Sequence, residues 1–368
     1  MLSCDVVVVG GGCVGASVAY HLAEAGCTDV VLLEANTLAS GSTSKAAGGI
    51  RMQHGDELNT QLAQRSLAEF TRFKEMTGSE IFFRQVGYLF LLDSQSDLDL
   101  FRAAAQMQRS YGIPVELLAP HDALDLIPQL DIDGLVGATF CPLDGYATPE
   151  SVVQGYASAA RRRGVQIRQG EHVTRIVTDN GRVTGVDVGD GHISTGAVVC
   201  AAGVGSAAVA ATAGVELPVS AERRRIFFSK QDGGLADGIP LTIDFATGFY
   251  FHREGPGLVF AGREFEAEEL IGPAMRRLPA LGDVPISSSW HGDYDMSPDH
   301  NGMVGQAEQL TGFYYATGFS GHGFQLSPAV GEHVAELVTG RTPTIDLTGL
   351  QAERFAPAGK RRVERIVI

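Results

Sequence analysis

The chain has 368 residues, of which 44% are hydrophobic and 19% charged, and its formal net charge at pH 7 is -15. This length and composition are those of a globular protein with one large or two smaller domains, and they exclude a disordered chain. The acidic balance argues against a nucleic-acid partner, because phosphate binding needs clustered Lys and Arg.

Cysteine usage and hydropathy indicate the cellular environment. Cys4, Cys13, Cys27, Cys141 and Cys200 form no C-x-x-C pair, and most lie in apolar runs, which favours reduced thiols over disulfides or zinc ligands. No apolar run approaches ~18 residues, and the first residues carry no basic region. We therefore expect a cytoplasmic protein with no membrane span and no metal.

The first thirty-four residues predict a strand, a glycine turn, a helix and a second strand. In the turn, G-x-G-x-x-G, Gly10 allows a tight turn, Gly12 lets a pyrophosphate approach the backbone, and Gly15 lets the helix pack on the strand. The helix offers free amides and its positive dipole end to phosphates. Glu34 ends the second strand, where a carboxylate accepts the ribose hydroxyls of an adenosine. Glycines alone could form a simple turn, but together these features indicate dinucleotide binding.

Small and polar residues follow from 35 to 51. One interpretation is a flexible linker; the other is a segment lying over the cofactor, where small residues allow close backbone approach. Beyond it, hydrophobic periodicity and turn residues define the elements. In chain order we expect helices over 57–77 (between Asp56 as cap and Gly78 as stop), 98–111, 150–163 and 328–339, strands over 85–92, 165–169, 173–178, 182–188, 197–200, 226–228, 248–252, 258–261 and 312–317, and surface loops over 119–143.

Several motifs occur in the order found in a known superfamily of flavoproteins. They are the glycine fingerprint with Glu34, the segment from Ser42 to Arg51, the strand end Ala201-Ala202-Gly203, the stretch from Tyr294 to Asn301, and the glycine loop from Gly318 to Phe324. In these motifs the chain resembles the FAD-dependent D-amino acid oxidase and glycine oxidase superfamily. The branch is that of sarcosine oxidases, dimethylglycine dehydrogenases and the beta subunits of dye-linked L-proline dehydrogenases.

The resemblance implies an α/β fold, with a Rossmann-like FAD-binding domain of the glutathione-reductase type and an inserted, sheet-rich α+β substrate domain. We expect a discontinuous FAD-binding domain over residues 1–80, 145–215 and 305–368, and a substrate domain over 81–144 and 216–304. No second G-x-G-x-x-G pattern occurs, so we expect no separate NAD site.

The resemblance also assigns residues around the cofactor. Backbone amides of the last motif, aided by the helix that follows, would stabilise negative charge on the pyrimidine side of the reduced ring. The residues expected to bind FAD are Gly10, Gly12, Val14, Gly15, Glu34, Ala35, Ser42, Thr43, Ala47, Gly48, Gly49, Val173, Ala202, Gly203, Gly321, His322, Gly323, Phe324 and Gln325.

Four residues are candidates for catalysis and substrate binding: Arg51, Tyr294, His322 and Gln325. Arg51 matches the superfamily's substrate-carboxylate arginine, whose planar fork binds a carboxylate bidentately; the alternative is a structural arginine. Tyr294 matches a pocket tyrosine of sarcosine oxidases, with an ordinary core aromatic as the alternative. We expect His322 to contact the flavin through its backbone, because hydride transfer from a neutral amine needs no strong base.

Three positions depart from the pattern of sarcosine oxidases. Gly292 stands where they carry the cysteine that holds the flavin covalently, so we predict non-covalent FAD. Gln325 replaces a lysine that helps to hold the carboxylate, which implies a shorter or less acidic headgroup or a different pose. Val259 aligns with the lysine that promotes reaction with oxygen, and its loss favours a dehydrogenase over an oxidase.

These features imply an FAD-dependent oxidation of the C–N bond of a small amino acid, secondary or N-methylated, such as sarcosine, proline or a glycine-like amine. Hydride transfer to flavin N5 would give an imine that hydrolyses, and oxygen or a redox partner would accept the electrons. The chain could act alone or as a subunit of a hetero-oligomer. The alternatives are an FAD-dependent 2-hydroxy acid dehydrogenase and a non-catalytic, FAD-bound assembly factor.

Overall fold

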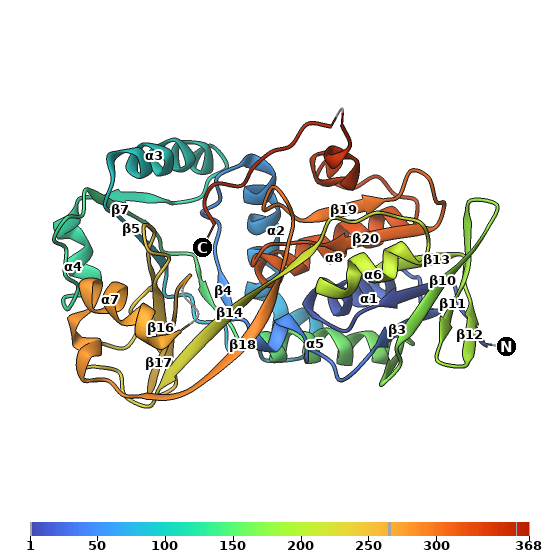
Figure 1. Ribbon diagram of the computed structural model, residues 1–368, viewed down its shortest axis with the longest axis horizontal. Helices are drawn as coiled ribbons and strands as arrows, with labels where there is room; N and C mark the ends of the chain where they lie inside the picture. Colours follow the sequence, from blue (N-terminus) through green and yellow to red (C-terminus); the bar gives the residue numbers. More distant parts are fainter. Residues whose placement is uncertain (1, 264–265, 358, 368) are drawn as a thin grey trace.

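The computed structural model describes residues 2–263, 266–357 and 359–367. Two large sheets lie side by side along the longest axis of the molecule, with helix α2 (Glu57–Thr77) between them (Figure 1). Every helix of the described residues is too short or too polar to cross a membrane.

A six-stranded sheet carries β2, the strand that leads into the glycine turn, among its inner strands. Five neighbouring strands are parallel, and the sixth, β19, runs antiparallel at one edge. The four valines of β2 are all buried, as expected for a parallel strand covered on both faces. The strand order is β19 (Met303–Gln306), β20 (Phe313–Thr317), β13 (Ala197–Cys200), β2 (Val6–Val9), β3 (Val30–Glu34) and β9 (Gln166–Gln169).

Four helices pack together beside this sheet. Helix α1 (Cys13–Glu24) contacts both α8 (Gly323–Val338) and α5 (Pro149–Arg162), and α2 packs on α8. The predicted ends of α2 are confirmed, because the Asp56 carboxylate accepts a hydrogen bond from Asn59 N at 3.0 Å and Gly78 has φ 73°. This bundle holds the N-termini of α1 and α8 close to the strand ends.

An eight-stranded sheet forms the other half of the molecule. All its pairs are antiparallel except β5 with β15. Alternate residues of β5 face opposite ways: Leu89 and Leu91 pack with residues of α4 and α7, whereas Tyr88 and Phe90 lie in a separate cluster. The order is β18 (Ile286–Met296), β14 (Ser220–Ser229), β17 (Gly257–Ala261), β16 (Tyr250–Glu254), β15 (Leu241–Asp244), β5 (Tyr88–Leu92), β7 (Gly137–Cys141) and β6 (Glu116–Leu118).

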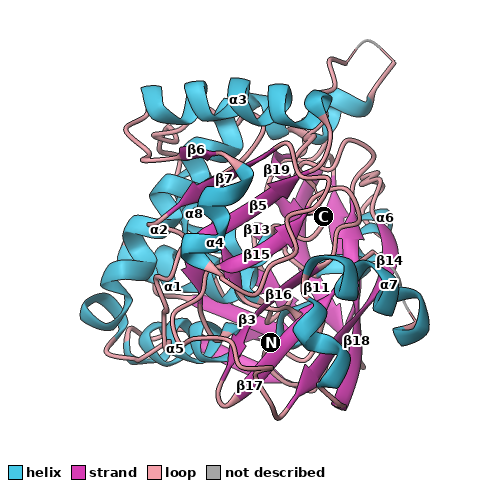
Figure 2. Cartoon of the chain, turned by 90° about the vertical axis from the view of Figure 1, so that its left-hand side faces the viewer, coloured by secondary structure: helices cyan, strands magenta, loops and turns pink. Residues whose placement is uncertain are grey.

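Smaller elements complete the fold. Figure 2 shows α4 and α7 in front of the eight-stranded sheet and α3 above it. The remaining helices are α3 (Gln95–Ser110), α4 (Ala123–Leu126), α6 (Ser206–Ala211), α7 (Ala267–Arg277) and the 3-10 turns η1 (Ser42–Lys45), η2 (Pro120–Asp122), η3 (Gly203–Gly205), η4 (Pro279–Asp283), η5 (Thr348–Leu350) and η6 (Ala352–Phe355). The remaining strands are β1 (Leu2–Ser3), β12 (Gly191–Ser194), β11 (Arg182–Val188) and β10 (Val173–Asp179) in one sheet, and β4 (Gly49–Ile50) with β8 (Gly145–Tyr146) in another.

Two predicted elements are wrong in type or extent. The stretch 119–143, predicted as surface loops, contains α4 and the largely buried strand β7, because pairing with β5 and β6 overrides its weak local pattern. The last long helix begins at Gly323, and Pro328 lies inside it. Pro328 has no N–H for the carbonyl of Phe324, and the Ser327 hydroxyl donates to that oxygen at 2.8 Å instead.

The fold is the predicted mixed α/β architecture, with a Rossmann-like parallel sheet and a separate antiparallel sheet. The division into domains at residues 80, 144, 215 and 304 stays a prediction, because sheet membership does not define independently folding units.

Candidate cofactor and substrate site

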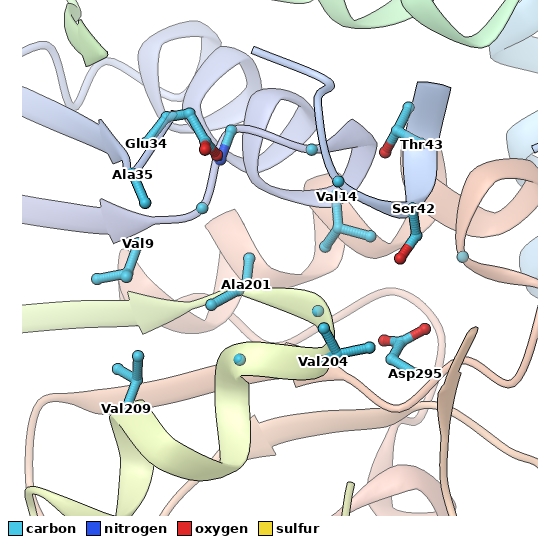
Figure 3. Close-up of a pocket in the computed structure, with 18 of the residues that line it drawn as sticks. Val9, Val14, Glu34, Ala35, Ser42, Thr43, Ala201, Val204, Val209 and Asp295 are labelled. Carbon is cyan, nitrogen blue, oxygen red and sulfur yellow. The ribbon is translucent and has the colours of Figure 1, made fainter. Parts of the chain in front are cut away.

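A cavity of about 590 Å³ lies at the carboxyl ends of β2, β3 and β13. Figure 3 shows Glu34 and Ala35 at one wall, facing Ala201, Val204 and Val209 across the hollow. Crevices at this edge of an open parallel sheet are where such folds bind ligands. The predicted cofactor residues that line it are Gly10, Gly12, Val14, Glu34, Ala35, Ser42, Thr43, Val173, Ala202, Gly203, Gly321, Gly323 and Phe324.

The glycine turn has the geometry of a phosphate cradle. A Cβ on Gly15 would fall 1.9 Å from the Gly10 carbonyl oxygen, so Gly15 allows α1 to pack on the turn and does not line the cavity. Gly12, by contrast, faces the cavity, and only Thr43 Oγ1 would lie near a Cβ there, at 3.2 Å. Gly12 provides no side-chain cap for α1, and the first turn of α1 holds no acidic residue. Cys13 N donates to Thr43 Oγ1 at 3.1 Å, so the helix dipole and the remaining amides of this turn are available to phosphates.

Glu34 lies where an adenosine ribose would be bound. Its Oε2 accepts a hydrogen bond from Gly11 N, and its Oε1 accepts one from Asn36 N, both at 2.8 Å. These bonds orient the carboxylate at the end of β3 and leave acceptor capacity for ribose hydroxyls. The donors and acceptors around this cavity therefore fit a dinucleotide such as FAD.

A second, smaller cavity of about 80 Å³ adjoins the first. Both cavities are lined by Ala46, Tyr294, Gly321 and Phe324, so these residues form their common boundary. All four predicted catalytic residues line the smaller cavity. The predicted residues found here are Ala47, Gly48, Gly49, Arg51, Tyr294, Gly321, His322, Phe324 and Gln325.

Arg51 is a buried cation without a carboxylate partner. Its side chain is held by the backbone carbonyl oxygens of Gln53 and Ile366, the latter at 2.8 Å, and by His322 Nε2 at 3.0 Å. Within residues 2–263, 266–357 and 359–367, it forms no ion pair. Asp144 and Glu364 act on its charge only through space, and burial raises the pKa of each carboxyl to about 7. Among the described residues, no carboxylate contacts the guanidinium directly.

The His322 side chain is neutral and accepts a hydrogen bond from Arg51. Burial, followed by the charge of Arg51, keeps the pKa of His322 well below its ordinary value. Because Nε2 accepts from the guanidinium, its lone pair is occupied and Nδ1 carries the ring proton. The side chain positions Arg51, a contact that the sequence analysis did not predict.

Gln325 lines the smaller cavity only, whereas Tyr294 belongs to the boundary that the two cavities share. Gln325 Oε1 accepts from the backbone N–H of Arg51 at 3.0 Å, which ties α8 to β4. The ring of Tyr294 packs so closely on Gly321 that a Cβ there would lie 2.7 Å from it. The guanidinium of Arg224 lies 5.7 Å from the centre of the Tyr294 ring.

Apart from Tyr294, the residues that the eight-stranded sheet contributes were not predicted from the sequence. Tyr88, Leu241, Ile243 and Tyr250 line the smaller cavity, together with Ser320. Tyr88 also explains Gly49, because a Cβ on that glycine would fall 2.6 Å from the tyrosine hydroxyl. Burial raises the pKa of Tyr88 and Tyr250, so both phenols stay protonated. The strands carrying the two tyrosines were predicted, but nothing local indicates which face meets the cavity.

The departures predicted from the sequence lie close to the same region. A Cβ at Gly292 would be 2.4 Å from the Cβ of Lys45, in the turn η1. Val259 is buried in a small cluster with Ala47 and Tyr250.

The fold and the paired cavities define a dinucleotide-binding protein with a second cavity beside the nucleotide site. The chain belongs to the family described as FAD dependent oxidoreductase, whose sequence profile matches residues 5–337. FAD is accordingly its cofactor, as predicted from the superfamily resemblance.

Three comparisons show its relatives. It is 29% identical over 374 residues to 4-methylaminobutanoate oxidase (formaldehyde-forming) of Paenarthrobacter nicotinovorans, covering 95% of this chain and 45% of that protein. It is 30% identical over 379 residues to mitochondrial sarcosine dehydrogenase of Homo sapiens, covering 95% of this chain and 41% of that one. The chain therefore spans less than half the length of these two relatives. The crystal structure of L-proline dehydrogenase from P. horikoshii superposes with a TM-score of 0.91 at 30% identity, covering 98% and 100% of the two chains.

Proposed function

We propose that the chain oxidises the C–N bond of a small secondary or N-methylated amino acid. The observation that carries the proposal is Arg51, a buried guanidinium without a carboxylate partner that lines a cavity next to the nucleotide site. A guanidinium of this kind suits a substrate carboxylate, which would supply the missing negative charge. The three relatives support the amine class, because each is named for a methylated amine or a cyclic amino acid.

The other walls of the cavity favour a small, uncharged skeleton. Leu241 and Ile243 provide apolar surface, and Tyr88, Tyr250 and Tyr294 provide aromatic faces against which a methyl or ring carbon can pack. A volume of about 80 Å³ admits only a few heavy atoms. No Asp or Glu of the described residues lines the cavity, so a second positive charge on the substrate would have no partner there.

The residues that line the cavity limit which group can accept a proton from the substrate amine. FAD, when bound, supplies the acceptor for the two electrons removed from the C–N bond. His322 cannot act as the base, because its free lone pair is taken by Arg51. With no carboxylate in the cavity, the amine must enter the reaction in its neutral form, having released its proton to solvent.

We further propose how the electrons leave and how the cofactor is held. Val259, packed on Ala47, offers no positive charge to stabilise reduced oxygen species, which supports a dehydrogenase with a redox partner. Gly292 offers no sulfur, which supports non-covalent FAD. A cytoplasmic location is supported by the free thiols of all five cysteines. The proposal also includes that the chain is one subunit of a hetero-oligomer.

An anaerobic titration of the FAD-loaded protein tests the reaction. Sarcosine, dimethylglycine, L-proline, D-alanine, L-alanine and lactate are added separately, and loss of the flavin absorption band is followed. We expect bleaching by the secondary or N-methylated amino acids and slow recovery in air. Bleaching by lactate alone would indicate a hydroxy acid dehydrogenase, and no bleaching at all would indicate a non-catalytic flavoprotein.

A further inference from the structure

The segment 364–366 returns to the interior of the molecule. Lys360, Arg361 and Arg362 are exposed, as a solvated end would be, but Glu364 and Ile366 are 1% and 0% exposed. In Figure 1 the last described residues run past α2 and end near β4, the strand that precedes Arg51. The exposed basic stretch 360–362 is therefore followed by two buried residues, Glu364 and Ile366.

Ile366 contacts the substrate-binding guanidinium through its backbone. Its carbonyl oxygen accepts from Arg51 Nη2 at 2.8 Å. Its side chain is buried in the apolar cluster that contains Tyr88, Phe90 and Ile243, so the carbonyl has little freedom to move. A neutral carbonyl orients the guanidinium and does not cancel its charge.

The Glu364 side chain holds the backbone around Ile366, whose carbonyl contacts Arg51. Its Oε1 accepts from Ile366 N at 2.7 Å and from Gly55 N at 3.0 Å, and its Oε2 accepts from Asn59 Nδ2 at 3.4 Å. One side chain thus joins the segment to the residues that lead into α2. Loss of this side chain would remove the hydrogen bond that holds Ile366 N and leave the Ile366 side chain in its apolar cluster.

The motif from Tyr294 to Asn301 anchors the same segment. The Asp299 carbonyl oxygen accepts from Glu364 N at 3.1 Å, and Asn301 Nδ2 donates to the Arg362 carbonyl oxygen at 2.5 Å. Asp299 is itself held by Arg354, through bonds of 2.8 and 3.0 Å. The second half of this motif therefore has a structural task separate from that of Tyr294.

We propose that residues 364–366 form a positioning strap, in which Glu364 holds the Ile366 carbonyl against Arg51 so that the guanidinium is preset for the substrate carboxylate. The proposal rests on the proposed function, because it assumes that Arg51 binds that carboxylate. Its physical basis is preorganisation: an arginine fixed by buried partners loses less side-chain entropy when a ligand binds. Glu364 and Ile366 act through Arg51 and are positioning residues.

The test compares Glu364→Ala with Glu364→Gln in the FAD-loaded protein. The amide oxygen of Gln can still accept from Ile366 N and Gly55 N, whereas Ala removes both bonds. We expect Glu364→Ala to raise KM for the amino acid about ten-fold with kcat nearly unchanged. Glu364→Gln should restore KM to within about three-fold of wild type. Val363→Ala, at a residue 59% exposed beside the strap, is the matched control and should behave as wild type.

A binding measurement separates this inference from the proposed function. Acetate, a bare carboxylate, is titrated against each oxidised protein, and its Kd is read from the change in the flavin spectrum. We expect Kd to rise about ten-fold in Glu364→Ala, whether or not any amino acid is oxidised. Unchanged Kd and KM in Glu364→Ala would overturn the strap while leaving the proposed function intact.

Two further outcomes are decisive. If Glu364→Ala does not fold, Ile366→Ala replaces it, since that change loosens the apolar anchor of the same carbonyl. A Kd for Ile366→Ala equal to that of wild type would then overturn the strap. A wild-type protein that binds no carboxylate would overturn the strap together with the role of Arg51.

Discussion

Nη2 of Arg51 donates a hydrogen bond to Nε2 of His322 at 3.0 Å, across 271 residues of sequence. One residue follows the short strand β4, and the other immediately precedes helix α8. The contact links the segment after β4 to the start of α8. It also makes His322 Nε2 a hydrogen-bond acceptor. It occupies the His322 lone pair and holds the buried guanidinium of Arg51, a residue that lines the smaller cavity.

The first prediction concerns this pair. Arg51→Lys keeps a positive charge but loses the planar fork that contacts His322 and the Ile366 carbonyl at once. We expect KM to rise about 100-fold or more, which corresponds to about 3 kcal/mol, while the FAD content is retained. Steady-state kinetics and the flavin-to-protein absorbance ratio measure both. An unchanged KM in Arg51→Lys and Arg51→Ala would refute the assignment of Arg51.

The second prediction concerns Glu34 and the cofactor. Glu34→Ala removes the acceptor of two backbone N–H groups as well as the expected ribose partner. We expect FAD affinity to fall about 10- to 100-fold, by loss of charge-assisted hydrogen bonds. Glu34→Gln keeps one acceptor oxygen, so its FAD affinity should lie between those of wild type and Glu34→Ala. Titration of apoprotein with FAD, followed by flavin fluorescence, gives each Kd; equal values in all three proteins would exclude a ribose contact.

The third prediction compares two glycines. A Cβ added at Gly15 collides with the Gly10 carbonyl, whereas one added at Gly196 meets no atom within 4 Å. Gly15→Ala should lower the free energy of unfolding by about 2 kcal/mol or more and weaken FAD binding, because α1 must shift. Gly196→Ala should stay within about 0.5 kcal/mol of wild type. Urea unfolding measures both; equal midpoints would show that α1 tolerates the shift.

The fourth prediction concerns pH. Burial raises the pKa of Asp144 to about 7, and burial, followed by the neighbouring Asp56, raises that of Glu364 to about 7, above ordinary values of 3.8 and 4.5. Between these limits the folded state binds more protons than the unfolded state, so the free energy of unfolding falls as pH rises toward 7 and this contribution is constant above it.

Glu364→Gln tests that slope, because the amide cannot ionise. We expect the loss of stability between pH 5 and pH 7.5 to be smaller in the variant by about 2–3 kcal/mol. Urea unfolding at the two pH values gives the difference. A wild-type slope equal to that of Glu364→Gln would show that Glu364 titrates near its ordinary pKa in the folded protein.

The fifth prediction concerns the attachment of FAD. Gly292 lies against Lys45 and provides no thiol for a bond to the flavin. Acid precipitation should therefore release all FAD into the supernatant, and the intact mass of the chain should carry no flavin increment. Yellow colour retained in the pellet would contradict a non-covalent cofactor and direct attention to another attachment residue.

The sequence by itself determined the nucleotide half of the site. Gly10 and Gly15 have no substitute at their positions, because any side chain would collide with backbone 1.9 to 2.3 Å away. Such steric demands allow only glycine at these positions, so the pattern can be recognised in the sequence. The spacing from the glycines to Glu34 is set by the helix, turn and strand that lie between them. Arg51 and the loop before α8 were predicted from the superfamily resemblance, which rests on motifs of residues that are neighbours in sequence.

Only the tertiary structure shows which strand residues complete the smaller cavity and what residues 364–366 contact. Tyr88 and Tyr250 lie on strands that sequence reasoning located, but the face that meets the cavity depends on how the two sheets are placed. The contact made by Ile366 comes from a backbone carbonyl, which every residue possesses and which no sequence pattern distinguishes. Arg51 meets its partners His322 and Ile366 only because the whole chain packs around them, and local sequence patterns do not describe that packing.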